Sequence, residues 1–141
     1  MKPINIKEKY GKFSKKWHPH QIATVDDMQV ILAKISGEFV WHSHKDEDEL
    51  FFVQKGTLQM RFRTPRPDSP SSKPTTTQES SYREWSETVK EGELIVVPRG
   101  VEHCPTTAEG EEVHLLLFEK ATTAHTGDVQ HEKTQTAYPK I

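Results

Sequence analysis

Residues 37–56 read GEFVWHSHKDEDELFFVQKG and combine an apolar pattern, broken by an acidic run, with two histidines two positions apart. The apolar residues on either side of the acidic run predict one strand over residues 38–44 and another over residues 50–54. Side chains two positions apart on a strand point to the same face, so we expect His42 and His44 to emerge together. This stretch therefore predicts a β structure that carries a pair of candidate metal ligands.

Short strands are expected along most of the remaining chain. Aliphatic and β-branched runs, separated by Gly and Pro, predict strands over residues 29–35, 58–63, 82–89, 93–97 and 113–119. The only expected helix is short and charged and covers residues 5–13. Many short strands with almost no helical periodicity favour an all-β sandwich or barrel.

The length and composition predict how the chain is divided. The chain has 141 residues, the size of one compact domain, and its hydrophobic fraction of 33% is low. Residues 64–81 are rich in Pro, Ser and Thr, and residues 121–141 hold few apolar anchors, so both are expected outside the core. We expect an N-terminal arm over residues 1–15, a barrel over 16–120 with a loop insertion at 64–81, and a C-terminal tail over 121–141.

Charge and cysteine content exclude several classes of function. The net charge of -2, with Lys and Arg scattered among acidic residues, offers no basic field to nucleic acid. No apolar run approaches the roughly 20 residues of a membrane span, and the first residues lack the apolar core of a secretory signal. We therefore expect a soluble, cytoplasmic protein with no nucleic-acid or membrane partner. Cys104 is the only cysteine, which excludes an intrachain disulfide and leaves His and carboxylates to hold any metal.

Further candidate ligands lie on both sides of the histidine pair. Glu49 begins the next expected strand, where an inward carboxylate can complete a mixed site, although Glu47 and Asp48 in the same acidic run are alternatives. His103 follows the tight Pro98–Gly100 turn, which can bring a third imidazole over the same face. A histidine pair taken alone is more often a surface feature. Close imidazoles repel when protonated, however, whereas a divalent cation makes their closeness favourable.

At these residues the sequence resembles the cupins, in particular the small single-domain cupins of the mannose-6-phosphate isomerase-like type. Their first motif is Gly, His-x-His, three or four residues, Glu, six residues and Gly. The chain matches it from Gly37 to Gly56, with an opening gap one residue shorter than the commonest form. Their second motif is Gly, five residues, Pro-x-Gly, two residues, His and, three residues on, usually Asn. It is matched by Gly92, Pro98, Gly100 and His103, with Thr107 at the Asn position.

The resemblance implies a double-stranded β-helix, the jelly-roll-like cupin barrel, over roughly residues 16–129. It also implies one divalent metal ion per chain, Fe, Mn, Ni or Zn, and a homodimer formed through sheet edges. The motif spacing favours Glu49 over its acidic neighbours. The implied metal ligands are His42, His44, Glu49 and His103.

Two classes of function remain open. Four protein ligands leave about two positions of an octahedral ion free, so the first interpretation is a metal-dependent enzyme acting on a small oxygenated substrate. The resemblance implies dioxygenase, isomerase, decarboxylase or lyase chemistry, and Glu49 is the candidate catalytic residue, acting as a general base. The alternative is a non-catalytic cupin that binds a sugar or another small ligand. We expect no appended DNA-binding segment, and this favours the enzyme.

Strand parity predicts the walls of the site. Phe51 and Val53 share the face of Glu49 and are expected inside the barrel, opposite Met60 or Phe62 on the paired strand.

The remaining cysteine and histidines are expected outside the site. Cys104 is expected to be a buried or turn thiol that faces away from the metal, and His114 a satisfied strand histidine. The histidines outside the motifs are expected on the surface: His18, His20, His125 and His131.

Overall fold

The computed structural model describes residues 2–66 and 81–141, and in these ranges it contains one short helix and eight strands. The helix is α1 (Ile6–Tyr10). The strands are β1 (His20–Val25), β2 (Met28–Ile35), β3 (Glu49–Lys55), β4 (Thr57–Pro65), β5 (Tyr82–Lys90), β6 (Leu94–Val97), β7 (Glu102–Thr106) and β8 (Val113–Lys120). The all-β expectation is confirmed.

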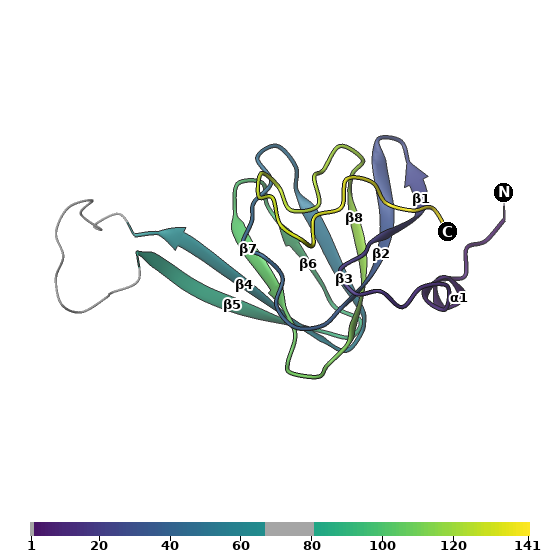
Figure 1. Ribbon diagram of the computed structural model, residues 1–141, viewed down its shortest axis with the longest axis horizontal. Helices are drawn as coiled ribbons and strands as arrows, with labels where there is room; N and C mark the ends of the chain where they lie inside the picture. Colours follow the sequence, from purple (N-terminus) through teal and green to yellow (C-terminus); the bar gives the residue numbers. More distant parts are fainter. Residues whose placement is uncertain (1, 67–80) are drawn as a thin grey trace.

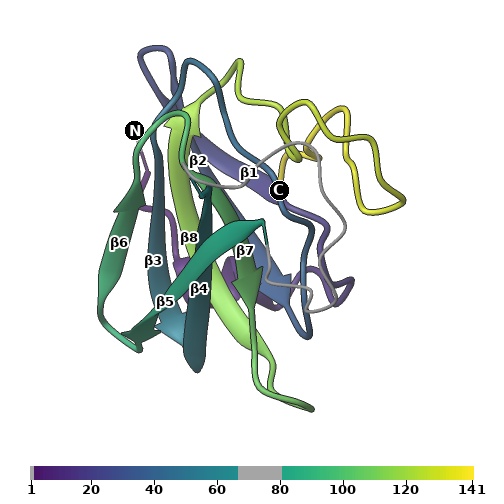
Figure 2. The same cartoon turned by 90° about the vertical axis from the view of Figure 1, so that its left-hand side faces the viewer.

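The strands form two antiparallel sheets. The larger sheet has the order β1-β2-β8-β3-β6, and the smaller has the order β5-β4-β7. Figure 1 shows β4 and β5 extending together away from the rest of the fold, and Figure 2 shows the smaller sheet in front of the larger one. The inner faces of the two sheets enclose the core.

The core follows the two-residue alternation of its strands. Buried and less buried residues alternate along β3, β4 and β8, because neighbouring strand side chains point to opposite faces. The interior positions expected from strand alternation are confirmed, since each of these side chains has at most 6% of its surface exposed to solvent. They are Phe51, Val53, Met60 and Phe62. The expected pairing of the strand that carries Phe51 with the strand that carries Met60 is wrong, because β3 and β4 lie in different sheets. Only Gly56 separates these two strands, which is too short a connection for a hairpin turn.

The strand expected over residues 38–44 does not form, and this expectation is wrong. The segment makes only two isolated bridges with β7, Glu38 to Thr106 and His42 to His103. Phe39 donates its backbone N–H to the carbonyl of Pro105 at 3.0 Å. Pro105 has no N–H with which to return a bond, so a continuous ladder is interrupted at this residue. These two bridges still hold residues 38–42 alongside β7.

Two strands were not expected from the sequence, and the helix is shorter than expected. β1 (His20–Val25) mixes polar and apolar residues, and β7 (Glu102–Thr106) contains a proline, which weakens the strand signal in both. The Asn5 side chain caps α1 by accepting the Glu8 N–H at 3.1 Å, and the helix ends at Tyr10. No helix in the described ranges is long and apolar enough to cross a membrane.

The boundary of the expected loop insertion moves by two residues. β4 continues through Thr64 to Pro65, which pairs with Tyr82 at the start of β5. The Arg66 N–H then donates to the Ser81 carbonyl at 3.0 Å. The remainder of the expected insertion, residues 67–80, lies outside the described residues.

The C-terminal segment, residues 121–141, forms no helix or strand, yet it packs against the barrel. Tyr138 is packed against the hydrophobic core, and Thr126 retains only 1% of its surface. Gln21 of β1 holds the end of the segment, donating to the Pro139 carbonyl at 2.9 Å and accepting the Ile141 N–H at 3.1 Å. Figure 1 shows this segment in yellow, running back across the strands. The expectation that it lies outside the core is therefore wrong.

Candidate metal centre

The two histidine-bearing segments are joined at the histidines themselves. His42 donates its backbone N–H to the His103 carbonyl at 3.1 Å, and His103 donates to the His42 carbonyl at 2.9 Å. The Gly100 N–H donates to the His44 carbonyl at 2.7 Å. The ring centres of His42 and His103 consequently lie 4.3 Å apart, and those of His42 and His44 lie 5.0 Å apart. The backbone thus brings three imidazoles from two distant parts of the sequence together.

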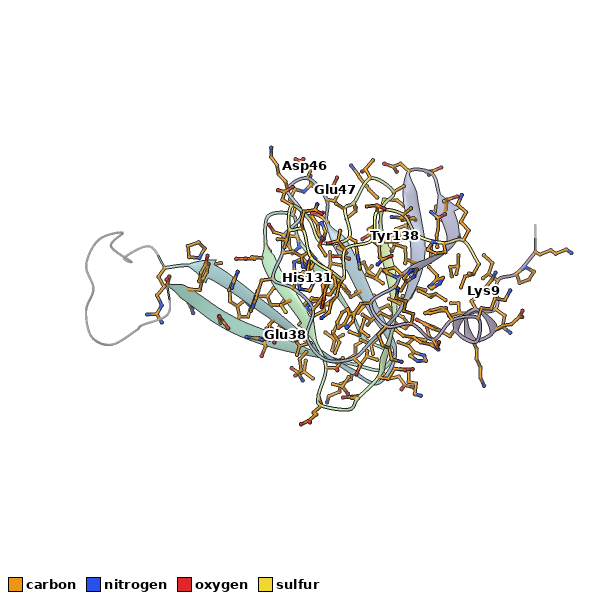
Figure 3. The ribbon with its side chains drawn as sticks, viewed as in Figure 1. Lys9, Glu38, Asp46, Glu47, His131 and Tyr138 are labelled. Carbon is orange, nitrogen blue, oxygen red and sulfur yellow. The ribbon has the colours of Figure 1, made fainter. Side chains whose placement is uncertain are left out.

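Glu49 is the acidic residue that enters the interior. It is the first residue of β3, pairs with Val97 of β6, and retains 6% of its surface. Asp48 instead accepts hydrogen bonds from the Arg99 backbone N–H at 2.9 Å and Nε at 3.1 Å, which hold it on the surface. Figure 3 shows Glu47 at the rim of the fold. The choice between the three acidic neighbours therefore falls on Glu49.

The four side chains form a compact cluster. One potential ligand atom from each of His42, His44, Glu49 and His103 lies within 4.8 Å of all the others, and all four residues are buried. Glu49 Oε2 lies 3.2 Å from His44 Nε2 and 3.4 Å from His103 Nε2. The structure thus brings together the four residues that the sequence singled out.

Backbone carbonyls orient two of the imidazoles. Val40 O lies 2.9 Å from His42 Nδ1, and Val101 O lies 2.9 Å from His103 Nδ1. A carbonyl oxygen only accepts, so each Nδ1 must carry the hydrogen, and in a neutral ring the Nε2 lone pair is then free to face the cluster. Metal-binding histidines are oriented in this way by a partner on the second ring nitrogen.

Three buried atoms at the centre of the cluster have no hydrogen-bond partner among the described residues: His44 Nε2, Glu49 Oε2 and His103 Nε2. Buried polar atoms are rarely left without a partner, because losing water without replacing its hydrogen bonds is unfavourable. Lone pairs and a carboxylate that converge on one point fit a divalent cation. The residues present therefore fit the metal that the sequence implies.

The electrostatics of the cluster favour the forms that bind metal. Burial, supported by the nearby His103, lowers the pKa of His42 to about 3, so this ring is neutral at neutral pH. Burial alone would raise the pKa of Glu49, but the neighbouring His103 and His44 outweigh it and hold that pKa below its ordinary value. A neutral imidazole beside an ionised carboxylate is the combination that a divalent metal requires.

A narrow cavity adjoins the cluster. It measures about 30 Å³, the volume open to the centres of water molecules, which is room for about two or three waters. Its apolar and aromatic walls come from both sheets and both ends of the chain, and its polar lining is limited to a few groups. The polar lining residues are His42, Glu49, Glu119, His125 and Tyr138.

Three of these lining residues were not identified from the sequence. Glu119 lies on β8 and shares the inward face of Leu115 and Leu117, so strand parity alone could have identified it. His125 and Tyr138 come from the C-terminal segment, whose sequence carries no periodic signal.

Glu119 is buried beside Glu49. Its Oε1 accepts a hydrogen bond from Gln29 Nε2 at 3.0 Å, and it retains 2% of its surface. Burial, together with the neighbouring Glu49, raises the pKa of Glu119 well above its ordinary value.

The other expectations for cysteine and histidine have mixed outcomes. Cys104 is buried, lies outside the four-residue cluster and contacts Thr106, as expected for a thiol that faces away from the site. His114 is confirmed as a satisfied strand histidine, since its Nε2 donates to Glu112 Oε1 at 2.6 Å.

The four histidines outside the motifs were expected on the surface, and this expectation is only partly confirmed. His131 is exposed as expected, and His18 is half-buried. His20 retains only 9% of its surface and stacks on Phe13, and His125 lines the cavity, so the surface expectation is wrong for both.

Thr107, at the position where the second motif commonly has Asn, connects the two motifs. Its Oγ1 accepts the Gly37 N–H at 2.8 Å, and its own N–H donates to the Gly37 carbonyl at 3.0 Å. The departure from the motif therefore leaves the cluster intact.

Comparison with known proteins agrees with this geometry. A cupin-2 domain containing protein from Shewanella frigidimarina NCIMB 400 is 37% identical, with a TM-score of 0.65, over 83% of this chain and 93% of that chain. Protein NMB1881 from Neisseria meningitidis is 28% identical, with a TM-score of 0.63, over 85% of this chain and 100% of that chain. The uncharacterized protein YdbB of Bacillus subtilis (strain 168) is 43% identical over 58 residues, which are 41% of this chain and 45% of that protein.

The family assignment rests on most of the chain. The family described as Cupin matches residues 2–138, which include both motifs, all eight described strands and the C-terminal segment up to Tyr138. The fold, the four-residue cluster and this match agree, and the chain belongs to the cupin family.

Proposed function

We propose that this cupin is a metal-dependent enzyme that holds one divalent ion with His42, His44, Glu49 and His103 and acts on a small oxygenated substrate at that ion. The observation that carries the proposal is the convergence on one point of three buried atoms that have no hydrogen-bond partner among the described residues. When bound, Fe, Mn, Ni or Zn would polarise or activate an oxygen-containing ligand at its open positions, as dioxygenase, isomerase, decarboxylase or lyase chemistry requires.

The protein's own groups supply orientation, water exclusion and a base. The Val40 and Val101 carbonyls fix the rings of His42 and His103, and the aromatic cavity wall limits the water that can enter. Glu49 is the proposed general base, because its ionised Oε2 lies at the centre of the cluster and next to the cavity.

A non-catalytic cupin is the second candidate, and one observation favours it. The cavity is only about 30 Å³ and is lined in part by His125 and Tyr138 of the C-terminal segment, as suits a metal that pins the structure or retains a small ligand. The two candidates differ in turnover, since a binding protein releases its ligand unchanged.

The deciding experiment combines metal analysis with a substrate screen. Protein purified without a histidine tag is analysed for metal, reconstituted with each of Fe(II), Mn(II), Ni(II) and Zn(II), and incubated with small oxygenated acids, diols and phenols. Dioxygen uptake and product formation are followed, with the His103→Ala protein as control. Metal-dependent turnover that is absent from the control is expected. Metal binding without turnover across the screen would favour the binding protein.

A further inference from the structure

The C-terminal segment is fitted closely against the residues that carry the histidine pair. Gly127 has φ +53°, and a Cβ at this position would overlap the carbonyl oxygen of Ser43, the residue between His42 and His44. Lys133 Nζ donates to the Glu38 carbonyl at 2.5 Å. The segment is therefore part of the wall of the site rather than a separate tail.

His125 and Tyr138 are the residues of this segment that line the cavity, and His125 is the one with an imidazole ring. Its ring centre lies 5.1 Å from that of Phe39, which in turn meets the His42 ring edge-on at 5.4 Å. Tyr138 packs edge-on against His125 with ring centres 5.8 Å apart. Two aromatic rings thus hold the imidazole in place beside the four-residue cluster.

The hydrogen bonding of His125 determines which nitrogen carries its proton. The Gln135 backbone N–H donates to His125 Nδ1 at 3.1 Å, so Nδ1 acts as an acceptor. Burial lowers the pKa of His125 to about 4, against the raising effects of the Glu49 charge and the Lys133 carbonyl, so the ring is neutral at neutral pH. With Nδ1 accepting from Gln135, the single hydrogen of the neutral ring is on Nε2. The Lys133 carbonyl lies near the ring as a backbone acceptor, and no side chain among the described residues accepts this hydrogen.

The charges around the cavity limit what can enter. Among the residues that the structure describes, the cavity lining includes no Lys or Arg, while Glu49 and Glu119 contribute two carboxyl groups. With a divalent ion bound, the ionised Glu49 leaves about one net positive charge, because the raised pKa of Glu119 keeps that carboxyl neutral. One positive charge balances a monoanionic ligand, whereas a phosphate ester dianion would keep an unbalanced negative charge in an apolar site. A small ligand with an apolar body and a single acceptor oxygen suits the aromatic walls and the imidazole donor.

Building on the proposed metal function, we propose that His125 is a substrate-binding residue whose Nε2–H donates a hydrogen bond to an oxygen of the metal-bound ligand. The ligands that this site takes are small, uncharged or monoanionic molecules with a mainly apolar body, and phosphorylated sugars are excluded.

Two substitutions separate this donor from the packing role of the ring. In His125→Asn the side-chain oxygen stands near the former Nδ1 and can still accept from Gln135, but the Nε2 donor is lost. In His125→Gln the amide N–H reaches the position of Nε2, while the contact to Gln135 is lost. His131→Asn, an exposed histidine on the same segment, is the matched control.

The probe is acetohydroxamate, a small oxygen chelator with an apolar methyl group, titrated into Co(II)-loaded protein and followed by the cobalt absorption bands. Metal content is measured first in every variant and is expected to equal that of the wild type. We expect His125→Asn to bind the probe about tenfold more weakly, His125→Gln to stay within about threefold of the wild type, and His131→Asn to be unchanged. Inorganic phosphate is expected to bind at least tenfold more weakly than the probe.

The possible failures are distinguishable. A wild type that takes up no metal overturns the proposed function and this inference with it. Full metal content with equal probe affinity in His125→Asn and the wild type overturns the role of His125 alone. Phosphate binding as tight as that of acetohydroxamate overturns the ligand class. A long-range ¹H–¹⁵N spectrum of the wild type gives an independent check, because a hydrogen on Nδ1 of His125 would also contradict the proposal.

Discussion

His42 and His103 exchange both of their backbone hydrogen bonds, at 3.1 and 2.9 Å, although 60 residues separate them in the sequence. Directly paired residues on antiparallel segments have their side chains on the same face, so this pairing fixes the separation of the two rings. The first and second motifs therefore meet at the proposed ligands themselves, and any shift of register would separate the rings.

Removing the metal should lower thermal stability. Without a cation, the cluster holds lone pairs and a carboxylate face to face, whereas free metal at a hundredfold above its Kd stabilises the folded state by about 3 kcal/mol. For a domain of this size we expect a fall in Tm of about 10 °C on adding a chelator, measured by calorimetry. His103→Ala serves as the control and should respond weakly. A wild-type Tm that does not change on chelation would indicate an ion bound outside the cluster.

The metal-free protein should lose stability in acid through His125. The pKa of His125 is about 4 in the folded protein and 6.5 when unfolded, so the unfolded state binds the extra proton first. This contribution is fully present above pH 6.5 and is lost as the pH falls towards 4, amounting to about 2 kcal/mol at pH 5. Urea unfolding at pH 7 and pH 5, with chelator present, measures it. His125→Asn should show a smaller loss than the wild type, and equal losses would contradict the assignment.

Glu119 should have the opposite pH dependence. Its pKa is raised in the folded state, so above its ordinary value of 4.5 the unfolded state releases a proton that the folded state retains. Stability therefore falls as the pH rises from about 4.5 towards the folded pKa, by up to about 1.4 kcal/mol per pH unit. Glu119→Gln keeps an oxygen to accept from Gln29 and should abolish this fall in metal-free protein. The exposed Glu109→Gln is the control, and identical pH profiles for all three proteins would contradict the raised pKa.

Glu49→Gln should separate metal binding from turnover. The amide oxygen can still coordinate, but the negative charge and the basic lone pair needed for proton transfer are lost. We expect metal content to remain above half of the wild-type value and turnover to fall at least a hundredfold, with both measured on the same preparation. Full turnover in Glu49→Gln would rule out the proton-transfer role and leave the metal site standing.

The fold and the cluster could be predicted from the sequence because their signals are local. His42, His44 and Glu49 lie in one short stretch, and the turn before His103 is marked by Pro98 and Gly100. The alternation of inward and outward side chains along β8 would also have placed Glu119 in the interior of the barrel.

The rest of the site depends on contacts between residues far apart in the sequence. Pro105 interrupts the pairing of residues 38–44 with β7, an effect visible only once the two segments are known to be neighbours. His125 and Tyr138 reach the cavity because Gly127 allows the chain to pass against Ser43, and no periodic pattern in a polar segment indicates that approach.

The most direct test of the four-residue metal centre is the metal content of His103→Ala beside that of the wild type. His103 comes from the second motif, so its loss leaves His42 and His44 with Glu49 as an incomplete site. His114→Ala, a change to a strand histidine outside the cluster, is the matched control. After reconstitution and gel filtration, we expect about one divalent ion per chain in the wild type and the control, and less than a tenth of that in His103→Ala. Equal metal content in His103→Ala and the wild type would contradict the account.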